Sequence, residues 1–168
     1  GNDGNTVEFW LKKGAFNPAA TQTEVIFDIF TTSSISSSLD YGRLTVEMSG
    51  TSTGSPFFVT YMSGTNGISK EQIGNSLTPA SITDGNWHHY SLRFRNEGSN
   101  TSVDLFVDGQ FNDNIKTGTT VDYVSGTIVG TIGALATHPS GTHGGAPQAA
   151  KGWGKLSGSL DEFRFWKT

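Results

Sequence analysis

The chain has 168 residues, a formal net charge of −4, 22 glycines and no cysteine. No apolar run reaches the roughly 18 residues that a membrane-spanning helix needs, and no cluster of Lys and Arg points to nucleic acid. The lack of cysteine excludes disulfides, thiolate zinc sites and cysteine nucleophiles. Length and composition therefore predict one domain with its own packed core, without membrane insertion or a nucleic-acid partner.

Alternation of apolar and polar residues runs through most of the chain. In Thr6–Lys13 every second residue is apolar, which is typical of a β-strand with one buried face. The pattern, or a short apolar run, recurs in Glu24–Phe30, Arg43–Met48, Pro56–Met62, Trp87–Arg95, Val103–Val107 and Leu160–Trp166. These segments predict an all-β fold.

Turn and loop residues separate these segments. Asp108-Gly109 predicts a two-residue hairpin turn, and Asn96–Thr101 predicts a longer polar hairpin loop. A helical turn is expected at most in Asn66–Leu77. Thr31–Leu39 and Ala134–Lys155 are predicted loops, and the length of the second is typical of loops that carry function.

Four short motifs stand in chain order: TVEFWLK (6–12), DGNWHHY (84–90), VDLFVDG (103–109) and GSLDEFRFW (158–166). Together they resemble the laminin G-like jelly rolls of the concanavalin A-like lectin and glucanase superfamily. The resemblance implies an antiparallel β-sandwich of two curved sheets packed face to face. It also implies a single laminin G-like domain over residues 1–168, as a module of a longer protein.

Members of this superfamily are mostly binding or adhesion modules, and a minority are glycosidases or lyases. The glycosidases carry Glu-x-Asp-x-Glu or Glu-x-Asp-x-x-Glu on one strand, and neither pattern occurs here. Asp161 and Glu162 are neighbours on a predicted strand, so we expect them on opposite faces. The Gly-x-Ser-x-Gly match at residues 50–54 precedes a strand-like segment rather than a helix and is interpreted as chance. We therefore expect no enzymatic activity.

The histidines do not predict a zinc site. His88 and His89 are adjacent on a predicted strand and should point to opposite faces, and the resemblance makes the Trp87-His88 pair a packing feature. His138 and His143 lie in the long loop without a third ligand.

Calcium is the more plausible metal, because carboxylate and backbone oxygens suit it. In part of the superfamily an aspartate of the last strand ligates a structural ion. Asp161 matches that position, and Asp3 is a possible N-terminal partner. The alternative is that Asp161 accepts a backbone hydrogen bond near the end of its strand.

Sugar binding needs exposed aromatic rings beside amides and acids. The candidate rings are Trp10, Phe30, Phe58, Tyr61 and Trp153. Most of the eleven phenylalanines are expected to fill the core. The predicted ligand-binding residues are therefore Trp153, His138, His143 and Trp10.

Three functions stay open. The first is a non-catalytic carbohydrate-binding or adhesion module that recognises surface glycans or polysaccharide. The second is a structural or protein-interaction domain, contacting other domains of a phage virion protein or a bacterial surface protein. The third is a glycosidase or lyase domain with converging acids or a Tyr/His pair in a groove. We expect an extracellular, cell-surface or virion location.

Overall fold

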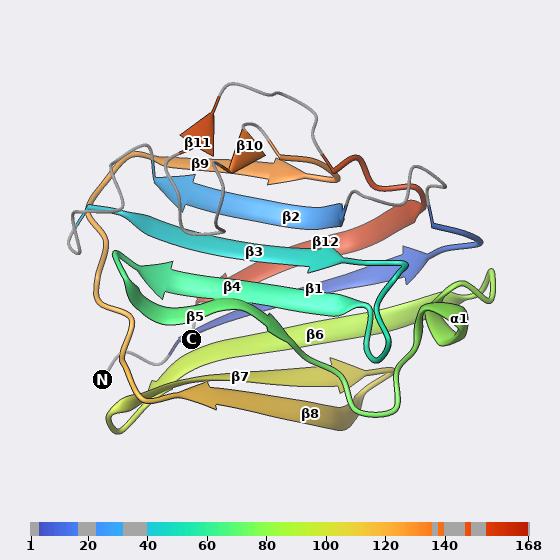
Figure 1. The fold of residues 1–168 in the computed structure, drawn as a ribbon, viewed down its shortest axis with the longest axis horizontal. Helices are drawn as coiled ribbons and strands as arrows, with labels where there is room; N and C mark the ends of the chain where they lie inside the picture. The colour runs from blue at the N-terminus through green and yellow to red at the C-terminus, as the bar shows by residue number, and fades with distance from the viewer. Residues whose placement is uncertain are drawn as a thin grey trace.

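The computed structural model describes residues 4–16, 23–31, 40–135, 138–139, 147–148 and 154–167. Two antiparallel five-stranded sheets pack face to face as a sandwich (Figure 1). The predicted all-β sandwich is thereby confirmed. In the described residues no helix is long and apolar enough to cross a membrane.

The two sheets lie one behind the other in Figure 1. The rear sheet, in the order β12-β1-β6-β7-β8, contains β1 (Asn5–Lys12), β6 (Trp87–Glu97), β7 (Asn100–Val107), β8 (Gln110–Thr117) and β12 (Ser159–Lys167). The front sheet, in the order β5-β4-β3-β2-β9, contains β2 (Glu24–Thr31), β3 (Gly42–Met48), β4 (Phe57–Ser63), β5 (Asn66–Gln72) and β9 (Ile128–Ile132). Outside the sheets are helix α1 (Pro79–Ile82) and a strand pair, β10 (His138–Pro139) with β11 (Pro147–Gln148).

The hydrophobic core fills the space between the sheets, and the alternation seen in the sequence explains how. On β1, Val7, Phe9 and Leu11 point inward and are at most 2% exposed. Burial of such side chains is the main force that holds two sheets together. The core members from the other strands include Phe27, Val46, Met48, Phe57, Val59, Ile68, Tyr90, Leu92, Phe94, Val103 and Leu105.

The helical turn expected in Asn66–Leu77 is wrong. That segment begins with β5, which pairs with β4 and inserts Ile68 into the core. The helix starts later, at Pro79, where proline suits the first helical position. Thr78 caps it, because its side chain accepts a hydrogen bond from the backbone N–H of Ser81 at 3.1 Å.

Of the two predicted hairpin turns, one has the predicted length and the other is shorter. Asp108 and Gly109 both have positive φ, 49° and 78°, as a two-residue hairpin turn requires. The loop predicted over Asn96–Thr101 is shorter than expected, because β6 runs to Glu97 and β7 starts at Asn100.

A β-bulge interrupts the alternation of β12. Glu162, with a φ of 51°, and Phe163 both lie opposite Phe9. Leu160 and Phe163 both pack against the core, and the two residues between them are exposed. Asp161 and Glu162 therefore share the outer face, and the expectation that they point to opposite faces is wrong.

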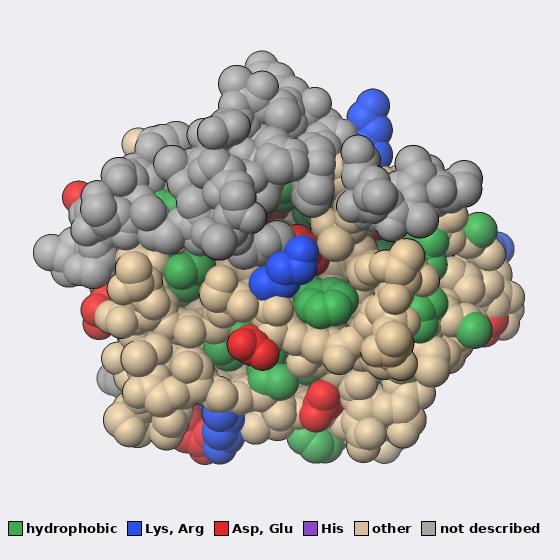
Figure 2. Space-filling view, viewed as in Figure 1, with side chains coloured by type: hydrophobic (Ala, Val, Ile, Leu, Met, Phe, Trp, Pro, Cys, Tyr) green, Lys and Arg blue, Asp and Glu red, His purple; other side chains and the backbone are tan. Residues whose placement is uncertain are grey.

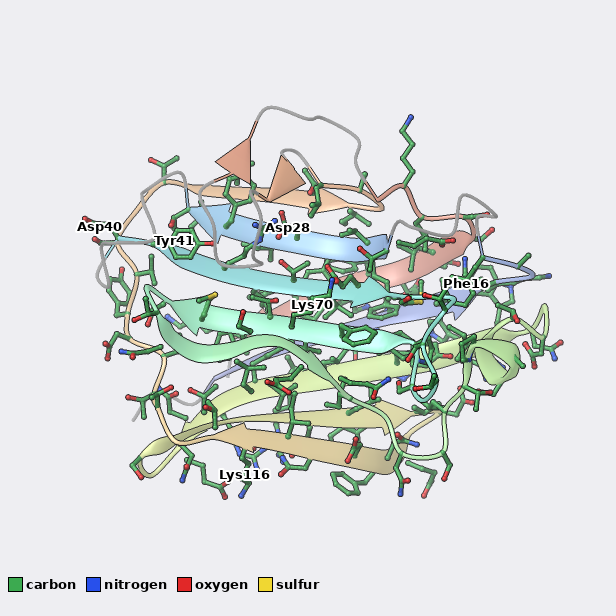
Figure 3. All side chains as sticks on the ribbon, viewed as in Figure 1. Phe16, Asp28, Asp40, Tyr41, Lys70 and Lys116 are labelled. Atoms are coloured by element: carbon green, nitrogen blue, oxygen red, sulfur yellow. The ribbon has the colours of Figure 1, made fainter. Side chains whose placement is uncertain are left out.

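A buried ion pair lies on the outer face of the front sheet. The guanidinium of Arg43 donates to both carboxylate oxygens of Asp28, at 2.9 and 3.0 Å. The hydroxyl of Thr45 donates to the same carboxylate at 2.5 Å. Both charged side chains are fully buried, and Figure 3 places Asp28 on β2. Each charge therefore depends on the other for its compensation.

Replacing Asp28 with asparagine should destabilise the fold by about 3–5 kcal/mol, because Arg43 is left as an uncompensated buried charge. Urea denaturation of the wild type and the Asp28→Asn variant measures this difference. Lys116→Ala is the control, because Lys116 pairs with Glu97 where both side chains are about half exposed. Equal effects of the two substitutions would contradict a structural role for the buried pair.

Candidate functional site

Three tryptophans lie on the outer face of the rear sheet. On β1 the inward positions belong to the core, so Trp10 points outward and is 39% exposed. Trp87 on β6 lies opposite Lys12, and Trp166 on β12 lies opposite Thr6. Cross-strand partners share a face of the sheet, so all three rings are on the same side. We call this surface the tryptophan face; it comprises Trp10, Trp87, Trp166, Glu8, His89, Asp161, Glu162, Arg164 and Lys12.

The register of the strands spreads the three rings along the face. Trp87 is level with residue 12 of β1 and Trp166 with residue 6. Six residues of a strand span roughly 20 Å. Trp10 lies between them, so the rings form a line that crosses three neighbouring strands.

Glu8 holds the middle of the tryptophan face in place. Its Oε1 accepts hydrogen bonds from the indole Nε1 of Trp166 at 3.1 Å and from Arg164 at 3.4 Å. Its Oε2 lies 3.8 Å from Nε2 of His89. The ring of His89 in turn packs against Trp10, with centroids 5.3 Å apart. One carboxylate on β1 thus contacts side chains of both neighbouring strands, β12 and β6.

The structure brings two of the predicted site residues together. Trp10 and Asp161 are register partners on β1 and β12. His138 belongs to β10, opposite Gln148, and its side chain is not described. The remaining predicted site residues lie outside the described residues: Trp153, His143 and Asp3.

Asp161 has the backbone contact that was the alternative to a metal role. Its Oδ1 accepts a hydrogen bond from the backbone N–H of Glu162 at 2.8 Å, within the bulge. In the described part of the chain, no three His, Asp or Glu side chains form a group suited to a metal ion. Calcium binding by Asp161 and Asp3 stays a prediction.

The other candidate aromatic residues do not join the tryptophan face. Phe30 is buried beneath Arg43, and Tyr61 packs edge-on against Phe94 at 5.2 Å. Phe58 is half-buried on the outer face of the front sheet, with the ammonium of Lys70 6.0 Å from its ring centre. Figure 2 shows that face, and in its coloured part the hydrophobic side chains are separated by polar ones.

Sequence reasoning missed two members of the face. Trp87 was assigned to packing through the resemblance, yet its side chain is 41% exposed. Trp166 was not considered, although it is 50% exposed. The alternation that placed Trp10 outward could also have placed Trp87 outward, because Trp87 alternates with the apolar residues Tyr90 and Leu92 of the same predicted strand.

Comparisons of the chain with protein-family models and with curated protein sequences gave no match. The tryptophan face is therefore interpreted from its own geometry and chemistry.

A second polar cluster, at the end of β6, surrounds His88. Its Nδ1 lies 2.9 Å from Asp108 and its Nε2 lies 3.2 Å from Asp84. His88 and His89 thus contact different groups on opposite faces, as predicted. Only an imidazolium can donate to both carboxylates at once.

The pKa values of the cluster agree with a protonated ring. The hydrogen bond to Asp108 raises the pKa of His88 above its ordinary value, against the effect of burial. Hydrogen bonds from Asn86, together with that from His88, lower the pKa of Asp84 to about 2. Burial works to raise the pKa of Asp108, but the hydrogen bonds from His88 and from the His89 backbone lower it.

The cluster should stabilise the protein in a limited pH range. The raised pKa of His88 gives stability that is present below about pH 6.5 and is lost as the pH rises through the folded pKa. The lowered pKa values of the two aspartates give stability that is lost only as the pH falls below about 4. His88→Gln should therefore lower the melting temperature by about 1–3 °C near pH 5.5 and by less at pH 8.5. A double-mutant cycle with Asp108→Asn is the control, and a coupling that does not change with pH would contradict the account.

Proposed function

We propose that the protein is a non-catalytic carbohydrate-binding module and that the tryptophan face binds an extended polysaccharide. The observation that carries this proposal is the exposure of Trp10, Trp87 and Trp166, between 39% and 50%, on a sheet face that does not pack on the core. Exposed aromatic rings that gather on one face are typical of a binding surface. A ligand that stacks on the rings accounts for their position.

The chemistry of the face suits sugar rings. Sugars present C–H groups that stack on indole, and hydroxyls that need planar polar partners. Asp161 and Glu8 offer carboxylate oxygens to hydroxyl donors, and Arg164 offers N–H groups to hydroxyl oxygens. The line of rings across three strands favours a polymer over a single sugar.

The charges on the face favour a neutral polysaccharide over an acidic one. The cations Lys12 and Arg164 are outnumbered by Glu8, Asp161 and Glu162, and Arg164 is paired with both Glu8 and Glu162. The next cation on this face, Arg93 opposite Thr6, is paired with Asp104. An acidic polymer would therefore meet the repulsion of the carboxylates around the rings. The resemblance to laminin G-like modules supports the same proposal, together with its extracellular or virion location.

The setting of the acidic residues supports binding rather than glycoside cleavage. Asp161 and Glu162 share a face, but they lie on an open sheet surface and do not line the cavity between the sheets. Glu162 is held by Arg164, and Asp161 accepts a backbone hydrogen bond. A glycosidase needs two carboxyl groups that flank the scissile bond, one on each side. Two neighbouring carboxylates on an open surface do not suit that arrangement.

A protein partner is the second candidate for the tryptophan face. Tryptophan and arginine are enriched in the centres of protein interfaces, and the face has three tryptophans around Arg164. This observation favours the structural role in a surface or virion assembly. A binding assay with polysaccharides distinguishes the two candidates, because only the first predicts binding.

Trp10→Ala and Trp166→Ala should each weaken binding to a neutral polysaccharide by about five- to thirtyfold, or about 1–2 kcal/mol, because each removes one stacking ring. Isothermal titration calorimetry against soluble β-glucans, mannans, xylans and galactans measures this effect. Thermal melts confirm that the variants are folded.

Tyr123→Ala is the matched control, because Tyr123 is an aromatic residue that is 78% exposed outside both sheets. Its affinity for polysaccharide should equal that of the wild type. If no polysaccharide of the panel binds, the proposal is wrong and the protein-partner candidate replaces it. If a polysaccharide binds equally to the wild type and both tryptophan variants, the tryptophan face is not the site.

A further inference from the structure

The two long edges of the sandwich differ in how they are closed. At the β5/β8 edge, backbone N–H groups of Gly74 and Asn75 donate to Asp113 and Asn112 on β8, both at 2.8 Å. At the β9/β12 edge, the described contact is at one end, where the N–H of Leu156 donates to the carbonyl of Gly133 at 2.8 Å. In Figure 1, β12 descends from the right behind β3 while β9 runs along the top, so the two edge strands diverge toward the C-terminus of β12.

Inward-facing apolar side chains are exposed along this open edge. Ile128 and Ile132 on β9 are 65% and 55% exposed, and Phe165 on β12 is 44% exposed. One strand further into each sheet, Phe27 opposite Ile132 and Val7 opposite Phe165 are fully buried, and Thr31 opposite Ile128 is buried as well. The core is therefore uncovered where β9 and β12 separate.

A cavity of about 360 Å³ opens between the sheets at this place. Its apolar lining includes Ile29, Tyr61, Val124, Ile128 and Phe165. An apolar cavity of about 150 Å³ holds one benzene ring, so this one has room for about two large apolar side chains. We call the cavity and the adjoining edge of β12, from Phe163 to Lys167, the open seam.

We propose that the open seam binds an extended segment of another polypeptide, which pairs with the edge of β12 and inserts alternate apolar side chains between the sheets. In the described residues β12 pairs with β1 alone, so among these residues the N–H and C=O groups on the other side of its backbone have no partner strand. A strand satisfies these groups and at the same time points every second side chain inward. The expected partner segment has Val, Ile, Leu or Phe at alternate positions.

A second copy of this chain fits the open seam less well. Two copies paired through β12 would each bring the bulge at Glu162 and the charges of Asp161 and Arg164 to the contact, whereas a separate strand along Phe163–Lys167 lies beyond the one bulge. Two β12 edges placed side by side would also leave Ile128 and Ile132 uncovered, because these residues belong to the other sheet. A separate strand that enters between the sheets covers both sides of the seam.

The probe is a synthetic peptide with valine or isoleucine at alternate positions and Thr, Glu or Lys between them. We expect it to bind the full chain and to slow hydrogen exchange of the amides from Phe163 to Lys167. A peptide of the same composition in scrambled order should bind at least tenfold more weakly. Fluorescence polarisation measures affinity, and hydrogen exchange with mass spectrometry locates the peptide.

Phe165→Lys should weaken peptide binding at least tenfold, and Ile128→Lys should do so from the facing strand. Phe111→Lys is the matched control, because Phe111 is a 61% exposed phenylalanine on β8, at the far edge of the rear sheet. Because Phe165 and Ile128 are exposed, the substitutions should leave the fold intact, which a thermal melt checks.

Three results of the peptide experiments would overturn the proposal. They are equal binding of the ordered and scrambled peptides, protection of amides away from β12, and a loss in Phe111→Lys as large as that in Phe165→Lys. A dimer in sedimentation analysis that Phe165→Lys dissociates would also overturn it, in favour of a second copy at the seam.

Discussion

The structure depends on burying one face of each strand between two sheets, in a chain that has no disulfide to help it. A strand has two faces, so the core takes every second residue and leaves the alternate ones to the outer face of the sheet. On β1 this division gives Val7, Phe9 and Leu11 to the core and Trp10 to solvent. An outward tryptophan therefore contributes little to the core, which is why the tryptophan face points to a ligand.

Strand β12 links the two surfaces that we assign to binding. Its bulge at Glu162 resets the alternation, so Phe165 faces the core side and Trp166 faces the outer side. Trp166 then meets Glu8 on the tryptophan face, while Phe165 lines the open seam. A partner strand on β12 would therefore lie directly beside the proposed polysaccharide site.

Periodicity in the sequence was sufficient for most strands, since Thr6–Lys13 and Trp87–Arg95 bury one face each. It failed for β5, where Ile68 is the one large side chain that enters the core and no alternation is visible. It also failed for β12, because strict alternation from Leu160 would place Trp166 inward. The contact between Trp166 and Glu8 joins residues 158 positions apart, and local sequence patterns cannot predict a contact between such distant residues. The laminin G-like resemblance and the calcium site stay predictions.

Hydroxyl-radical footprinting of the wild-type protein, with and without a neutral polysaccharide selected by the calorimetric panel, tests the central claim most directly. The account predicts that oxidation of Trp10, Trp87 and Trp166 falls when the polysaccharide is saturating, because the sugar rings cover the indoles. Tyr123 should be oxidised at the same rate in both samples. Binding that leaves all three tryptophans as reactive as in the free protein would contradict the account.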